Sequence, residues 1–193
     1  GGCALANRKK RGRALQSSHE RSSLMMRIRA FGRARDALDQ LRLDHDLIRR
    51  LLREFDRLRM AGAGGPEGKA EIVECLCDTL ALHAHLEEEI FYPLVRSVAG
   101  ENSPALSAFC DHERLLELIA QLDEMEPGDP DFDATVGDIA DCVVPSMDSE
   151  QAVLFRLVRE AGIDTHALGE RMTRVRKAHQ RDFTHVEPVR QRA

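Results

Sequence analysis

Residues 82–93, LHAHLEEEIFYP, place two histidines and three consecutive glutamates inside what is otherwise the apolar stripe of a helix. His83 and Glu87 are four residues apart, so both side chains lie on one helix face, about 6 Å apart along the axis. Imidazole nitrogens and carboxylate oxygens at this spacing can hold one cation or bridge two. His85 and Glu89 lie away from the stripe, and we expect them at a solvated edge.

Three more apolar stripes are each interrupted near their middle by a residue that can bind a cation, namely His45, His112 and Glu150. Taken singly, such a histidine is more often a hydrogen-bonded core residue, and such a glutamate a surface charge. Antiparallel helices bring their middles to the same height, where these side chains would meet His83 and Glu87. Two facing buried carboxylates repel each other unless a cation lies between them. The pattern therefore favours a metal site, with iron first and manganese or zinc less favoured.

The elements that must position these residues are helices, because apolar residues recur at three- and four-residue steps. No segment alternates with period two, and the loops between the long segments have about four to eight residues. We predict an all-α fold, an up-down-up-down four-helix bundle with an additional shorter C-terminal helix. The predicted helices cover residues 33–60, 68–98, 103–122 and 136–157, and the fifth begins at Asp164 or Thr165.

Two prolines fall inside the predicted helices. Pro93 predicts a kink in the second helix, and Pro145 predicts an interruption of the fourth. Beyond each proline, the three- and four-residue steps continue the buried stripe through Leu94 in the second helix and Leu157 in the fourth.

The chain has 193 residues, of which 42% are hydrophobic and 32% charged. It is long enough to bury the core of one domain. No apolar run is long enough for a membrane span. The five cysteines are an odd number and follow no apolar signal segment, which favours a reducing, cytoplasmic location over a disulfide framework. We interpret them as core residues, with Cys110 beside His112 as the one exception.

Charge is unevenly distributed along the chain. Residues 1–35 hold ten of the 28 Lys and Arg residues but one of the 33 acidic residues, so a basic arm precedes an acidic body. Such an arm is compatible with weak nucleic-acid contact or with no specific role. Met25 or Met26 is a plausible translation start, which would make residues 1–24 non-native. The predicted organisation is a flexible basic arm (1–32), the helical bundle (33–161) and a C-terminal helix with its tail (162–193).

Four segments of the chain resemble the hemerythrin-like (HHE cation-binding) family: LRLDHDLIRRLLREF, HAHLEEEIFYPLVR, DHERLLELI and SMDSEQAVLF, within about residues 36–160. That family has a histidine on the first and third helices and an HxxxE motif on the second and fourth, around an oxo- or hydroxo-bridged pair of irons. The resemblance implies that His45 and His83 hold one iron. It also implies that Glu87 and Glu150 bridge the pair and that His112 serves the second iron.

The fourth helix departs from the family pattern. Ser146 stands where the histidine of HxxxE is expected, and Leu116 stands where oxygen-carrying hemerythrins have a second histidine. A serine hydroxyl is a poor iron ligand, so water would fill the vacancy. The resemblance then implies a weakened second site or a mononuclear centre. In one alternative, Pro145 shifts the register of the helix and brings Asp148 closer.

The resemblance implies a cytoplasmic protein with non-haem iron, di-iron or mononuclear, that senses, binds or stores iron, dioxygen, nitric oxide or peroxide. No separate general base, nucleophile or nucleotide loop is visible in the sequence, so a turnover enzyme is less favoured, with weak peroxidase or ferroxidase activity as its remaining form. The alternative is a metal-free, degenerate bundle that serves as an interaction module, with the basic arm contacting nucleic acid or a partner. Ser146 and Leu116 favour this alternative. Against it, an abandoned site would be more stable once refilled with leucine.

Overall fold

The computed structural model describes residues 36–62, 65–100, 103 and 112–184, with side chains as far as residue 179. The basic arm, Cys110 and the predicted start of the third helix lie outside these residues. Within the described part of the chain, all regular structure is helical. The elements are α2 (Ala37–Ala61), α3 (Gly65–Leu86), η3 (Glu87–Phe91), α4 (Tyr92–Ala99), α5 (His112–Glu124), α6 (Phe132–Ser149), η5 (Glu150–Leu154), α7 (Phe155–Glu160) and α8 (Thr165–Thr184).

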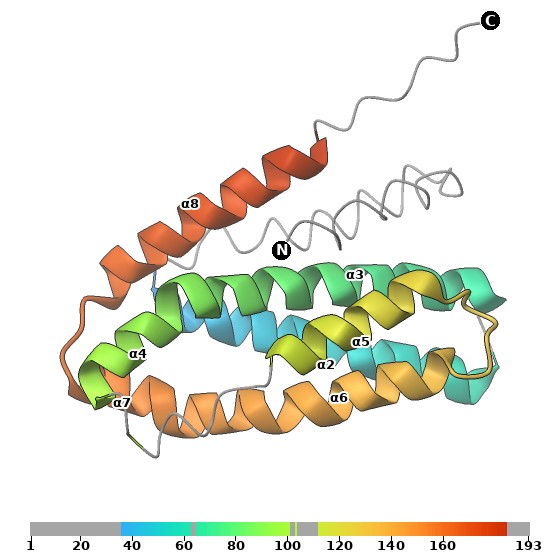
Figure 1. Ribbon diagram of the computed structural model, residues 1–193, viewed down its shortest axis with the longest axis horizontal. Coiled ribbons are helices and arrows are strands. Elements are labelled where there is room, and N and C mark those ends of the chain that lie inside the picture. Colours follow the sequence, from blue (N-terminus) through green and yellow to red (C-terminus); the bar gives the residue numbers. More distant parts are fainter. Residues whose placement is uncertain (1–35, 63–64, 101–102, 104–111, 185–193) are drawn as a thin grey trace, which may run out of the picture.

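These elements form four rods that lie side by side, and successive rods run in opposite directions (Figure 1). The rods are α2, then α3 with η3 and α4, then α5, and finally α6 with η5 and α7. Helix α8 leaves this bundle at an angle and packs against α2 and α3. The predicted all-α bundle with an additional C-terminal helix is therefore confirmed.

Local sequence explains where α2 and α8 begin and where the fourth rod ends. Asp36 caps α2, because its Oδ1 accepts hydrogen bonds from the backbone N–H groups of Leu38 at 2.8 Å and Asp39 at 3.3 Å. Gly162, with a φ of 66°, ends the fourth rod in a left-handed conformation that favours glycine. Asp164, the first of the two predicted caps, then receives the N–H groups of His166 and Ala167, each at 3.0 Å.

The second and fourth rods each contain one π-helical turn, which begins at a glutamate of the predicted site. The N–H of Tyr92 donates to the carbonyl of Glu87, and the N–H of Phe155 donates to the carbonyl of Glu150. Each bond spans five residues, and such turns occur often at functional sites. Pro93 lies in the first turn of α4, directly after the π-turn. Pro145 lies inside α6, which continues to Ser149, so the predicted interruption of the fourth helix at this proline was wrong.

Each π-turn inserts one residue into the helical repeat and shifts the buried face beyond it by one position. Val95 and Val158 are fully buried, whereas Leu94 and Leu157 are only half-buried. The two leucines predicted for the stripe pack against an apolar cluster, but they lie at the edge of the buried face and not at its centre. The prediction assumed a constant period of 3.6 residues, which a five-residue turn interrupts.

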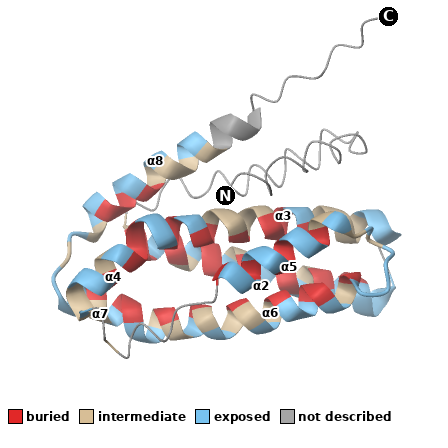
Figure 2. Ribbon diagram, in the orientation of Figure 1, coloured by how far each residue is buried: buried red, intermediate tan, exposed pale blue. Residues whose placement is uncertain are grey.

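The interior contains two apolar clusters, one toward each end of the bundle, and buried residues face inward along every rod (Figure 2). Along α2, Leu41 belongs to one cluster and Ile48 to the other, and the fully buried His45 lies between them. A polar layer therefore crosses the bundle where the predicted site residues lie. Among the described helices, none combines the length and apolar composition needed to cross a bilayer.

Candidate metal centre

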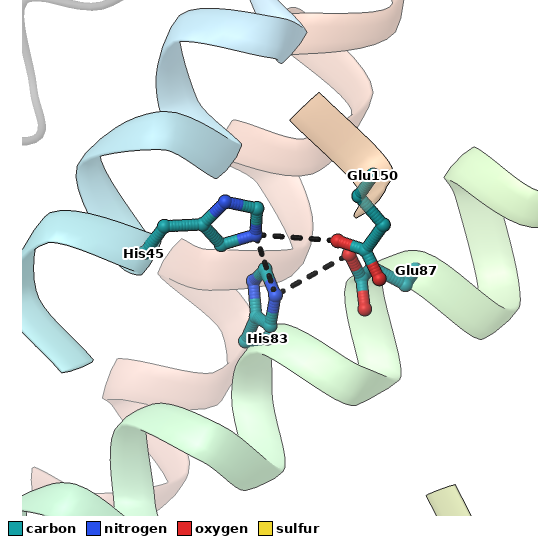
Figure 3. Close-up of side chains that lie close together, drawn as sticks. All are labelled: His45, His83, Glu87 and Glu150. Carbon is teal, nitrogen blue, oxygen red and sulfur yellow. Dashed lines mark hydrogen bonds and ion pairs between the residues drawn. The ribbon is translucent and has the colours of Figure 1, made fainter. Parts of the chain in front are cut away.

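Two histidines and two glutamates from four different elements meet in this polar layer (Figure 3). Each offers one donor atom, and these atoms all lie within 4.8 Å of one another. All four residues are at most 5% exposed, so the layer is closed to bulk water. The residues are His45 of α2, His83 of α3, Glu87 of η3 and Glu150 of η5.

One side of the pair formed by Glu87 and Glu150, the carboxylate pair, faces two imidazoles. His83 Nε2 lies 3.3 Å from Glu87 Oε1, and His45 Nε2 lies 3.3 Å from Glu150 Oε2. The two Nε2 atoms are 3.2 Å apart. We call these two nitrogens and two oxygens the imidazole side.

The two carboxylate oxygens of the imidazole side lack hydrogen bonds. Among the described residues, Glu87 Oε1 and Glu150 Oε2 are the buried side-chain oxygen or nitrogen atoms without a hydrogen-bond partner. Their contacts with the imidazole nitrogens are at ion-pair distance but do not have hydrogen-bond geometry. Leaving these two oxygens without a hydrogen bond in the interior is costly, so a cation at this position would relieve the penalty.

The other two oxygens of the carboxylate pair face hydroxyl groups. The Tyr92 hydroxyl donates to Glu150 Oε1 at 2.9 Å and to Glu87 Oε2 at 3.1 Å, and the Ser146 hydroxyl donates to Glu150 Oε1 at 3.2 Å. His112 Nε2 lies 3.3 Å from Glu87 Oε2 and its ring stacks on Tyr92. We call this the hydroxyl side. It is where the resemblance places a second iron.

Burial and mutual repulsion divide the carboxylate pair into one neutral and one charged group. Burial raises the pKa of Glu87 well above its usual range, and the negative charge of Glu150 raises it further. Burial also opposes ionisation of Glu150, but its close contacts with His45 and Glu87 outweigh burial and lower the pKa of Glu150 to about 2. The pair therefore shares one proton, which a bound cation would replace.

The imidazoles of His45 and His112 are held in the neutral form that can bind a metal. Burial lowers the pKa of both side chains, more strongly than the neighbouring carboxylates raise it. Neutral imidazole is the ligand form, because its unprotonated nitrogen carries the lone pair.

Each of the three imidazoles has its Nδ1 atom held by a polar partner, while its Nε2 atom faces the carboxylate pair. An outer partner on one ring nitrogen is typical of histidines that bind metals through the other. A flip of the Gln151 amide exchanges its oxygen and its nitrogen, so either atom can face His45 Nδ1. The pairs are His45 with Gln151 at 2.8 Å, His83 with Asp44 at 3.3 Å, and His112 with Glu88 at 3.0 Å.

Beside the centre lies a cavity of about 10 Å³, close to the minimum that holds one water molecule. On its polar wall it is lined by residues of the carboxylate pair together with His83, His112 and Ser146. The rest of the wall is apolar and belongs to the helices around it. These residues are Ile48, Leu80, Leu115, Val143 and Met147.

The structure brings all five predicted ligand residues into one layer, but His112 lies on the hydroxyl side and outside the group of four donors. His85 and Glu89 are exposed, as expected. Asp148 does not approach the centre, because it is exposed and forms an ion pair with Arg49 at 2.6 Å. The alternative that Pro145 brings Asp148 closer was therefore wrong.

Sequence reasoning missed the outer partners and Tyr92. Asp44, Glu88 and Gln151 each directly neighbour a predicted ligand in the sequence, which is the one local signal they carry. Tyr92 follows Glu87 by five residues, and in a regular α-helix it would point about 140° away. The π-turn closes this gap and brings the phenol onto the carboxylate pair.

Comparisons with known proteins agree with this arrangement. The family model of the hemerythrin HHE cation binding domain matches residues 36–157. A protein named DNA nickase from Nostoc sp. (strain PCC 7120 / SAG 25.82 / UTEX 2576) is 28% identical over 121 residues. That match covers 63% of this chain and 33% of the relative, so the chain spans about a third of the relative's length. No solved structure matches the chain significantly.

Proposed function

The chain belongs to the hemerythrin HHE cation-binding domain family, and from this premise we propose that its imidazole side binds one non-haem iron ion. The family match and the buried cluster of His and Glu together indicate metal binding. The finer proposal is a mononuclear iron centre that binds, senses or stores iron or a small oxidant such as dioxygen, nitric oxide or peroxide.

The observation that carries this proposal is the pair of buried carboxylate oxygens that have no hydrogen-bond donor and face two imidazole nitrogens. A protein evolved only for packing would be more stable with apolar residues at these positions. A cation satisfies both oxygens and both nitrogens at once, which explains why four polar side chains lie between two apolar clusters.

The spacing of the donors fits a single ion. Ligands that each lie about 2.1 Å from one ion, at angles of about 90–110°, are about 3.0–3.4 Å apart. On the imidazole side, the separations of 3.2 Å between the nitrogens and 3.3 Å for each nitrogen–oxygen contact fall in this range. Two nitrogens and two carboxylate oxygens suit iron, with manganese and zinc as the less favoured ions.

A small ligand is supported by the surroundings of the centre. Iron bound by four protein atoms has open coordination positions at which a diatomic molecule can bind. The adjacent cavity of about 10 Å³ is the size of one water molecule, so a diatomic ligand would require the surrounding side chains to move. The hydroxyl of Tyr92 and the ring of His112 supply polar groups on the hydroxyl side of the carboxylate pair.

The test is the metal content of protein purified without chelator. We expect about one iron per chain and little of the near-ultraviolet absorption of an oxo-bridged di-iron centre. Glu87→Gln should lose the metal, whereas Glu89→Gln, which alters an exposed glutamate two residues away, should retain it. Absence of metal from the wild type, or equal metal in wild type and Glu87→Gln, would contradict the proposal.

A second candidate, contact with DNA, is favoured by the relative named DNA nickase. The relative is about three times longer than the match, so its name does not by itself assign nicking to the matched part. On this chain, the exposed face of α8 carries Arg171, Arg174 and Lys177 at three-residue steps. Clustered cations of this kind bind phosphate backbones without sequence preference.

Plasmid binding and relaxation assays test this candidate. If α8 contacts DNA, replacing its three exposed cations by glutamine should weaken binding and make the remaining binding less dependent on salt. If the metal centre is required for nicking, Glu87→Gln should bind plasmid normally but leave it supercoiled. A wild-type protein that neither binds nor relaxes the plasmid would exclude this candidate.

A further inference from the structure

The geometry points to Arg176 of α8 as a positioning residue for the metal centre. Through Asp44 it orients His83, so that docking of α8 and binding of the ion strengthen each other. This inference rests on the proposed metal binding and assigns a role to the C-terminal helix, which lies beyond the family match.

The first link is a two-point contact between α8 and α2. The Arg176 guanidinium donates from Nη1 to Asp44 Oδ1 at 3.1 Å, and from Nη2 to Asp44 Oδ2. Asp44 is 2% exposed, and so deep a carboxylate requires a cationic or hydrogen-bonding partner. The planar guanidinium fork holds the carboxylate in one orientation, which a lysine ammonium would not do.

The second link runs from Asp44 to the metal ligand. Oδ2 of Asp44 lies 3.3 Å from His83 Nδ1, so Nδ1–H donates to the carboxylate. This contact selects the tautomer whose Nε2 lone pair faces His45 and the carboxylate pair. Arg176 thus reaches His83 through one shared carboxylate, although it lies 132 residues from Asp44 in the sequence.

A third contact fastens α8 at the same place. The buried Gln40 side chain donates from Nε2 to the Gly169 carbonyl at 2.8 Å and to Thr173 Oγ1 at 3.2 Å, and its Oε1 accepts from Arg176 Nε at 3.4 Å. Leu168 of α8 packs within the apolar cluster that also contains Leu41. Helix α8 is therefore docked by apolar contacts and held in register by polar ones.

The other two imidazoles are supported differently. Gln151 holds His45 and Glu88 holds His112, and both partners belong to the bundle itself. Among the three imidazoles described, His83 is the one whose support extends to α8. A change in the position of α8 would therefore act on the ion through this single ligand.

Coupling of this kind is reciprocal. If docked α8 raises the affinity for the ion by some factor, the bound ion favours docking of α8 by the same factor. Loss of an outer partner of a metal-binding histidine typically lowers metal affinity about 10–100-fold. We expect a loss in this range when Arg176 is removed.

The experiment compares Arg176→Met with Arg174→Met in the full-length chain. Arg174 is an exposed residue of the same helix, two positions away, and serves as the matched control. Each protein is titrated with Co²⁺, whose visible spectrum reports the number and orientation of its ligands. Arg176→Met should bind Co²⁺ about 10–100-fold more weakly, with an altered spectrum, while Arg174→Met should match the wild type. Arg176→Lys should fall between them.

A second measurement follows amide hydrogen exchange in α8 with and without Co²⁺. The ion should slow exchange in α8 of the wild type and of Arg174→Met, but not of Arg176→Met. If Arg176→Met does not fold, Asp44→Asn tests the same link with little change in volume. Equal Co²⁺ affinity and spectra in wild type and Arg176→Met would overturn this inference and leave metal binding intact. Failure of the wild type to bind Co²⁺ or iron would overturn both.

Discussion

The two sides of the carboxylate pair differ in what faces them, although they share the same two residues. On the imidazole side, Glu87 Oε1 and Glu150 Oε2 meet nitrogens at ion-pair distance and accept no hydrogen bond. On the hydroxyl side, the remaining oxygens accept hydrogen bonds from Tyr92 and Ser146. A hydroxyl brings its own proton, so this side is satisfied without a cation. The comparison shows how one pair of carboxylates can favour one ion rather than two.

The largest expected effect separates the histidines of the two sides. His83→Ala removes a donor of the imidazole side and should weaken iron binding by more than about 100-fold, since loss of an outer partner alone costs about 10–100-fold. His112→Ala removes a group of the hydroxyl side and should weaken binding less than about tenfold. Isothermal titration with Fe²⁺ under anaerobic conditions measures both. Equal losses in the two variants would show that the sides are not distinct.

Ser146→His should convert the hydroxyl side into a second metal position. The Ser146 hydroxyl lies 3.2 Å from Glu150 Oε1, so an imidazole there would join His112 on the same side of the carboxylate pair. We expect iron content to rise from about one to about two per chain, with near-ultraviolet absorption of an oxo-bridged pair. Metal analysis and an absorption spectrum decide the outcome. Iron content that stays at one would contradict the assigned position of Ser146.

Tyr92→Phe should act mainly on the metal-free protein. It removes the hydroxyl whose single proton lies between the two carboxyl groups, and a hydrogen bond to a charged group contributes about 1.5–3 kcal/mol. We expect the free energy of unfolding, measured by urea denaturation with chelator present, to fall by about 1–3 kcal/mol. Iron affinity should change less than tenfold, since Tyr92 does not face the imidazole side. If the loss in the free energy of iron binding exceeds the loss in the free energy of unfolding, Tyr92 belongs among the ligands.

Leu116→His is expected to have the smallest effect. In oxygen-carrying hemerythrins the corresponding position bears a histidine, but Leu116 is 45% exposed here and points away from the polar layer. A histidine at this position should leave iron content and affinity unchanged within error. A rise in iron content would show that the first turns of α5 can rotate toward the centre.

The sequence predicted the residues that meet at the centre because the helical period is undisturbed as far as each glutamate. His83 and Glu87 are related by a regular four-residue step, and Glu150 directly follows the last residue of α6. Their role as metal ligands is the proposal made here, and their common location follows from period and topology alone. Beyond each glutamate, a constant helical period predicts that Leu94 and Leu157 lie at the centre of the buried face. Val95 and Val158 lie there instead.

The sequence did not predict the π-turns. Small differences in local energy and in packing against neighbouring rods decide whether a backbone N–H donates to the carbonyl four or five residues earlier. Pro93 is a local signal for the first turn, since it lacks the N–H that a continuous α-helix would use. Residues 150–154 contain no proline. The second turn therefore has no comparable local signal.

Residue types and their spacing determined the helical bundle, the mixed nitrogen and oxygen donors and the absence of a histidine at position 146, because short-range steps along a helix decide which side chains share a face. Tertiary structure alone decided that hydroxyls satisfy one side of the carboxylate pair and leave the other side for a cation. It also joined Arg176 to Asp44 across 132 residues. These contacts depend on how separate helices pack and rotate against one another, and no local period of the chain encodes that rotation.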